Sequence, residues 1–134
     1  MTHTIARRSS LALGLAAIGG AVLGKAARAA DMKGMVKVTA LYGAPKDPAA
    51  FEAYYAATHM PLVYAVKGIA HVEIGKPMPG PDGTAPAFYR IAELWFENPA
   101  AMQGVMATPD WKKVVDDLAN FATGGVTILV SPVE

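Results

Sequence analysis

The chain has 134 residues, with twelve basic residues, eleven acidic residues and no cysteine. The lack of cysteine excludes disulfides, thiolate metal sites and cysteine nucleophiles, so the fold must be stabilised by packing alone. Lys and Arg form no cluster in the body of the chain, which argues against nucleic acid and against an anionic membrane surface as partners.

The first 29 residues resemble an export signal. Arg7 and Arg8 precede an uncharged apolar run at residues 11–24, and residues 27–29 fit a small-x-small cleavage site. The arginine pair resembles a twin-arginine signal, and a general secretory signal is the alternative. The run is too short to span a bilayer. We therefore expect a mature domain at residues 30–134, periplasmic or secreted and free of the membrane after cleavage, with eight basic and eleven acidic residues and a net charge of −3.

Local patterns predict four strands and three helices in the mature chain. Asp47-Pro48, Asn98-Pro99 and Thr108-Pro109 each combine an N-cap residue with Pro at the first helical position, and so begin the helices. The first helix runs through His59 toward Gly68, the second is short, and the third has one apolar face. The predicted strands are residues 35–43, 69–76, 87–96 and 124–133.

The order of these elements predicts a ferredoxin-like α+β fold of the type βαββαβ. Its four-stranded antiparallel sheet carries the helices on one face and leaves the other face uncovered. Apolar residues occupy both odd and even positions of several strands, as at residues 94–96 and 128–130. An apolar sheet face is unstable in water, so we expect a homodimer that covers it.

His59 is the main candidate for chemistry. It lies in the stretch FEAYYAATHMPL, two residues before Pro61, which cannot donate a hydrogen bond to the carbonyl of Ala57 and is expected to kink the helix. An imidazole titrates near neutral pH, so His59 can act as a general acid or base. Tyr55, one helical turn earlier, can hold or share its proton. The alternative is that His59 merely caps the interrupted helix.

Aromatic and apolar side chains near this helix predict a pocket for a small hydrophobic or aromatic molecule. The expected substrate-binding residues are Phe51, Tyr54, Leu62, Tyr64 and Trp95, although Trp95 suits the core better than a stacking role on a cofactor.

Other chemistries have weak support in the sequence. Ser131 is the only serine after residue 29 and lies outside any Gly-x-Ser-x-Gly turn, which argues against a serine hydrolase. His71 and Glu73 lie two apart on a strand and would complete a two-histidine, one-carboxylate metal site if His59 reached them. That spacing occurs often by chance, so the simpler interpretation is that they line an interface or face solvent, and we expect no metal or cofactor.

The segment DPAAFEAYYAATHMPLVYAVKGIAHVEI, residues 47–74, resembles the EthD family, named for ethyl tert-butyl ether degradation. Its most specific part is the Tyr-Tyr-x-x-x-His-x-Pro-Leu run, and the resemblance extends over residues 35–133. The resemblance implies that two ferredoxin-like domains pair as a dimeric α+β barrel. It also implies an activity like that of relatives that are cofactor-free dehydratases or decarboxylases, in a family often labelled oxidoreductase.

These observations predict an exported, cofactor-free enzyme of the proton-transfer type that uses His59, such as a dehydratase, decarboxylase, isomerase or oxygenase-like protein. In enzyme classes this means a lyase or an oxidoreductase. The alternatives are a non-catalytic binding or accessory protein of a degradation pathway, and an oxidoreductase with haem or metal. The sequence identifies neither the substrate nor the reaction.

Overall fold

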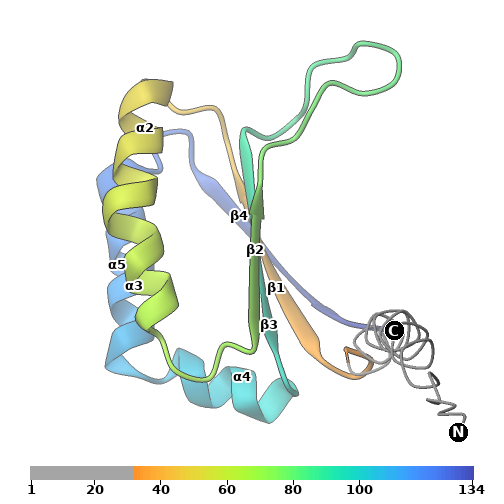
Figure 1. Ribbon diagram of the computed structural model, residues 1–134, viewed down its shortest axis with the longest axis vertical. Helices are drawn as coiled ribbons and strands as arrows, with labels where there is room; N and C mark the ends of the chain where they lie inside the picture. The colour runs from red at the N-terminus through yellow and green to blue at the C-terminus, as the bar shows by residue number, and fades with distance from the viewer. Residues whose placement is uncertain (1–31) are drawn as a thin grey trace, which may run out of the picture. The chain divides into compact units, whose positions relative to one another are not determined.

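The computed structural model describes residues 32–134 and contains one antiparallel sheet with helices on one of its faces (Figure 1). The strand order is β2-β3-β1-β4. The elements are β1 (Val36–Tyr42), α2 (Pro48–Tyr54), the π-helical turn η1 (Tyr55–His59), α3 (Met60–Ala65), β2 (His71–Gly75), β3 (Arg90–Phe96), α4 (Pro99–Met106), α5 (Pro109–Phe121) and β4 (Val126–Pro132). This confirms the predicted ferredoxin-like α+β fold. The expected signal at residues 1–29 lies outside the described residues.

Side-chain caps fix where the helices begin. Asp47, Asn98 and Thr108 each accept a hydrogen bond from the backbone N–H three residues later, and proline follows each of them. Such a cap stabilises a helix by about 0.5–2 kcal/mol.

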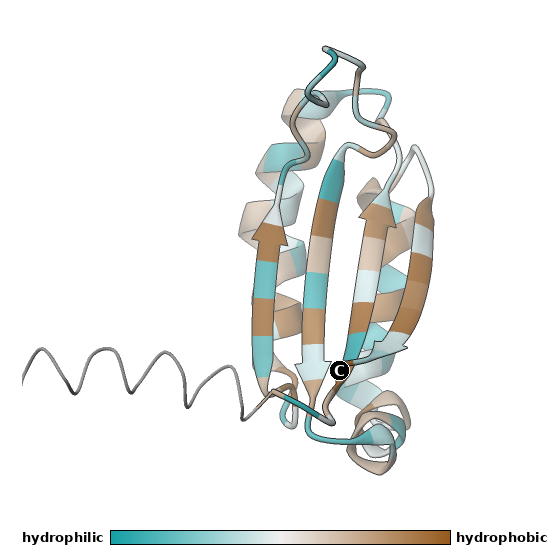
Figure 2. Ribbon diagram, turned by 90° about the vertical axis from the view of Figure 1, so that its right-hand side faces the viewer, coloured by the Kyte–Doolittle hydropathy of each residue, from teal (hydrophilic) through white to brown (hydrophobic). Residues whose placement is uncertain are grey.

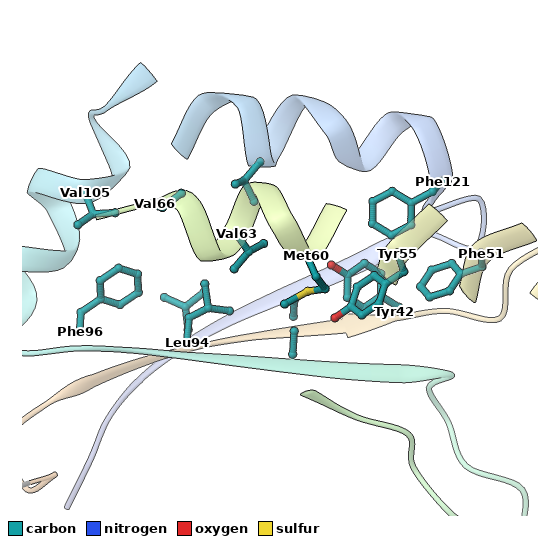
Figure 3. Packing of buried hydrophobic residues seen from close by; sticks show 14 residues of the cluster. Tyr42, Phe51, Tyr55, Met60, Val63, Val66, Leu94, Phe96, Val105 and Phe121 are labelled. Carbon is teal, nitrogen blue, oxygen red and sulfur yellow. The ribbon is translucent and has the colours of Figure 1, made fainter. Parts of the chain in front are cut away.

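The strand register decides which side chains lie beneath the helices. Val38 in the central strand β1 is opposite Leu94 of β3 on one side and Val130 of β4 on the other. Because side chains alternate between faces, the even-numbered residues of β1 and β3 point toward the helices. There they form the core with residues from the helices (Figure 3).

The helix that begins at Pro48 continues through Pro61 to Ala65. This agrees with the predicted run toward Gly68, and the distortion expected near Pro61 takes the form of the π turn η1, in which the N–H of Met60 bonds the carbonyl of Tyr55. A π turn contains one extra residue, so the helix is widened just before the position where proline provides no N–H. His59 is the last residue of this widened turn.

The uncovered sheet face is more polar than predicted. Lys37 and Glu93 form an ion pair at 2.8 Å, and His71 and Glu73 form another at 2.9 Å. Exposed apolar side chains are concentrated instead on β4, at residues 128–130, as the nearly continuous brown of that strand shows (Figure 2). The apolar surface to cover is therefore on this edge strand, with Leu129 on the uncovered face and Ile128 and Val130 on the helix side.

None of the helices in residues 32–134 combines the length and the hydropathy needed to cross a membrane.

Candidate functional site

His59 and Asp117 form a buried pair between the π turn and α5. Nδ1 of His59 lies 2.9 Å from Oδ2 of Asp117, and the His59 residue is only 2% exposed. Asp117 lies on the inward stripe of α5, between the buried residues Val114 and Phe121. Docking of the amphipathic helix α5 therefore places a carboxylate beside the imidazole.

The Asp117 carboxylate has three side-chain donors. The Tyr54 hydroxyl donates a hydrogen bond to Oδ1 at 2.6 Å, and the Asn120 amide donates one to the same oxygen at 3.0 Å. The third donor is Nδ1 of His59, which bonds Oδ2. Burial raises the pKa of Asp117, but these hydrogen bonds lower it by more, so that the pKa lies below its ordinary value. Asp117 is therefore ionised at neutral pH.

The His59 imidazole is neutral at neutral pH. Burial lowers its pKa, and the hydrogen bond and charge of Asp117 only partly offset this effect. A neutral imidazole beside an ionised carboxylate donates Nδ1–H to it and leaves a lone pair on Nε2. No group within residues 32–134 hydrogen-bonds Nε2. His59 thus has the tautomer and the free nitrogen that a general base requires.

A cavity of about 240 Å³ lies between the sheet and the helices, and His59 forms part of its wall. Most of the wall is apolar, including side chains from Val38, Ala40, Met60, Val63, Leu94 and Leu118. Besides His59, the lining side chains that carry polar atoms are those of Tyr42 and Trp111. Since an apolar cavity of roughly 150 Å³ can bind benzene, this one has room for a somewhat larger ring compound.

The cavity opens between α5 and β4. Val115 of α5 and Ile128 of β4 both line it, and they remain 46% and 50% exposed. A ligand therefore has a route in that passes apolar side chains.

The structure distributes the predicted site residues over several environments. The rings of Tyr55 and His59 stack with centroids 5.8 Å apart, but no hydrogen bond joins them, and it is Asp117 that accepts a hydrogen bond from His59. Phe51 stacks on Tyr55 in the core, and Tyr54 bonds Asp117.

Of the predicted site residues, only His59 is part of the cavity wall. Leu62 is partly buried against the core, and Tyr64 is 62% exposed. Trp95 lies on the uncovered sheet face beneath His71, with ring centroids 5.0 Å apart.

Sequence reasoning missed Asp117, Tyr42 and Trp111. A signal for Asp117 was present, because it is an acidic residue on the apolar stripe of α5 that includes Val114 and Phe121. Such a residue must find partners when the helix docks. Tyr42 and Trp111 had no distinguishing local signal.

The hypothesis of a metal site built from His59, His71 and Glu73 is wrong. His71 and Glu73 pair with each other on the uncovered face, and His59 lies beneath the helices on the opposite side of the sheet. Across residues 32–134, no group of three or more His, Asp or Glu side chains is arranged to hold a metal ion.

Comparisons with known proteins agree with the fold and the motif. A family model described as EthD domain matches residues 44–125. A protein of Rhodococcus erythropolis, named an uncharacterized 11.0 kDa protein in the thcB-thcC intergenic region, is 39% identical over 100 residues, which cover 75% of this chain and 96% of that protein.

Two solved structures carry the same family description. An EthD family protein from Bacillus halodurans is 29% identical with a TM-score of 0.69, over 75% of this chain and 99% of that chain. An EthD-like protein from Ralstonia eutropha is 26% identical with a TM-score of 0.60, over 75% of this chain and 92% of that chain.

More distant structures share the fold alone. They include SnoaB from Streptomyces nogalater, described as a cofactor-independent oxygenase, at 14% identity and a TM-score of 0.55 over 75% of this chain and 94% of that chain. They also include a hydroxynitrile lyase from Passiflora edulis, at 14% identity and a TM-score of 0.60 over 75% of this chain and 94% of that chain. On the family model and the relatives above 25% identity, the chain belongs to the EthD family.

Proposed function

We propose that this protein is an enzyme that transfers a proton to or from a small apolar or aromatic compound, with His59 as the general base and no cofactor. One observation carries the proposal: His59, paired at 2.9 Å with the buried carboxylate of Asp117, forms part of the wall of an otherwise apolar cavity.

The chemistry follows from the two protonation states. Nε2 of neutral His59 accepts a proton from a carbon or oxygen of the bound compound, and the imidazolium that forms is stabilised by the Asp117 carboxylate. The proton can then return to a different atom of the compound or to a leaving group. A positioned base of this kind contributes roughly a hundred- to ten-thousand-fold in rate.

The distant structures support the proposal only at the level of the fold. A cofactor-independent oxygenase and a hydroxynitrile lyase both use this architecture. Such sharing indicates that the fold can host reactions of several classes, whereas the function of each protein depends on its own site.

We also propose that the protein is an exported homodimer. Proteins of this fold from Bacteroides fragilis, Thermobifida fusca and Jannaschia are described as dimeric. Leu129 of β4, exposed on the uncovered sheet face, supplies apolar surface for such an interface. The proposal of export, to the periplasm or the medium, rests on Arg7, Arg8 and the apolar run that follows them.

The test is to incubate the purified protein with a small-molecule extract of the producing organism and to follow bound and consumed compounds by mass spectrometry. We expect the wild type to bind and consume at least one apolar compound, and His59→Ala to bind it without consuming it. If the wild type changes none of the compounds that it binds, the protein is a binding or accessory module. Equal consumption by His59→Ala would show that His59 is not the base.

A further inference from the structure

A buried tyrosine, Tyr42, lines the cavity, and a second one, Tyr55, packs against it. Tyr42, the last residue of β1, is part of the cavity wall, and its ring packs edge-on against the ring of Tyr55 with centroids 5.7 Å apart. Both residues are 2% exposed. In Figure 3 both hydroxyls are directed toward Met60, which also lines the cavity.

These two hydroxyls lack the partners that other tyrosines of the domain have. Tyr54 and Tyr89 donate their hydroxyls to the carboxylates of Asp117 and Glu52. Within residues 32–134, the buried hydroxyl of Tyr55 has no hydrogen-bond partner, and no hydrogen bond reaches that of Tyr42. Buried hydroxyls are normally paired, so the Tyr42 hydroxyl, which lies in the cavity wall and neither accepts nor donates a hydrogen bond within the described domain, is available to a ligand.

The surroundings keep both phenols protonated and therefore able to donate. Burial raises the pKa of Tyr55 to about 12, against the opposing influence of Arg90, and burial also raises the pKa of Tyr42. The Arg90 guanidinium lies 4.6 Å from the centroid of the Tyr55 ring and is held there by Glu52. A cation at this face makes the phenol a stronger hydrogen-bond donor.

We propose that Tyr42, supported by Tyr55, donates a hydrogen bond to a carbonyl oxygen of the ligand, and that the substrates are apolar or aromatic ketones. This inference rests on the proposed function, because it assigns the substrate class of the same cavity. It gives the cavity two complementary polar groups, a base at His59 and a neutral donor at Tyr42, within apolar walls.

The two groups together suit proton removal from the carbon next to a carbonyl. The proton moves from that carbon to Nε2 of His59, and the electron pair of the C–H bond becomes a C=C bond. The π electrons of the carbonyl move to its oxygen, and the enolate oxygen accepts the hydrogen bond from Tyr42. Such a donor acts most strongly on the negative charge that develops in the transition state.

The experiment compares two probes, acetophenone and ethylbenzene, which differ in a carbonyl group that replaces a methylene group. Their affinities for the full chain are measured by calorimetry. We expect the wild type to bind acetophenone more tightly. Tyr42→Phe should lower the affinity for acetophenone by about five- to tenfold and leave that for ethylbenzene unchanged, because a single neutral hydrogen bond is lost. The control Tyr64→Phe, at an exposed position, should change neither affinity.

The infrared carbonyl band of ¹³C-labelled acetophenone provides a second readout on the wild type itself. Hydrogen bonding to the phenol should shift the band to lower frequency, and Tyr42→Phe should abolish the shift. Equal loss of affinity for both probes in Tyr42→Phe would show that the tyrosine only packs, and the proposal would be wrong. An unshifted band in the wild type would also overturn it.

The outcome for this inference can be separated from that for the proposed function. If His59→Ala keeps full turnover while the wild type still prefers acetophenone, the base assignment fails and the donor site stands. If the wild type binds both probes equally while His59→Ala loses turnover, the donor site fails and the base stands. If neither probe binds, the cavity is not a site for such compounds and the ketone assignment is overturned.

Discussion

His59 and Asp117 lie 58 positions apart in the chain, and their side chains meet at 2.9 Å in the interior. The first belongs to a π turn and the second to α5, so their contact depends on how two helices dock on one sheet. The imidazole that closes the Tyr-Tyr-x-x-x-His motif thereby has a defined tautomer. The same contact makes Asp117 the residue through which the role of His59 can be tested.

Asp117→Asn should reduce turnover by about a hundredfold or more, because an amide can present its N–H₂ to the imidazole and favour the wrong tautomer. The measurement is the rate on a compound identified as a substrate, together with the ¹⁵N shifts of the His59 ring nitrogens. The matched control is Asp116→Asn, since the neighbouring Asp116 pairs with Lys112 at the surface. An unchanged rate and unchanged His59 ¹⁵N shifts in Asp117→Asn would contradict the assignment of a dyad.

The rate should depend on pH through the neutral form of His59. Burial lowers the pKa of this imidazole below its ordinary value of 6.5, and only the neutral form can accept a proton. We therefore expect kcat/KM to be at its plateau at neutral pH and to fall as pH drops through an apparent pKa below 6.5. An NMR titration of the His59 ring gives the same constant without a substrate. A midpoint above 6.5 would mean that the charge of Asp117 outweighs the effect of burial.

Gly124→Ala should destabilise the fold, because two backbone segments pass too closely there for a side chain. A Cβ at Gly124 would lie 2.3 Å from the carbonyl oxygen of Ala44 and 2.6 Å from the carbonyl carbon of Gly43. Separating the segments should lower the free energy of unfolding by about 1–3 kcal/mol. Urea unfolding measures this, with Gly75→Ala as the control, since a Cβ at Gly75 meets nothing within 4 Å. Equal stability of the two variants would show that the backbone at residues 43–44 can move away from residue 124 without loss of stability, and the prediction would be wrong.

Leu129→Lys should convert the proposed homodimer to a monomer. Leu129 of β4 is 50% exposed and lies opposite Thr39, whose side chain points to the uncovered sheet face. A lysine there would bring a charge into an interface formed by that face. Size-exclusion chromatography with light scattering is the measurement, and Tyr64→Lys on α3, at a position that is 62% exposed, is the control for adding a charge elsewhere. A wild type that is monomeric at micromolar concentration would overturn the proposal directly.

The sequence by itself determined the order of the elements and the fold class. The caps at Asp47, Asn98 and Thr108 and the apolar stripe of α5 are local features, because each depends on residues within one or two helical turns. Strand alternation is equally local. Consequently the predicted βαββαβ order agrees with the structure, and the chain's own motif indicated its family.

Only the tertiary structure decided which side chains form the candidate site. Asp117 meets His59, and Tyr42 reaches the cavity, because helix docking and strand register bring distant residues together. The same geometry leaves Tyr64 at the surface, although it lies five residues from His59 in the sequence. It also places Trp95 on the opposite sheet face, although Trp95 was predicted to line the same pocket as His59. Periodicity predicts that a residue faces inward, but the neighbour that it meets there is set by the packing of elements far apart in the chain.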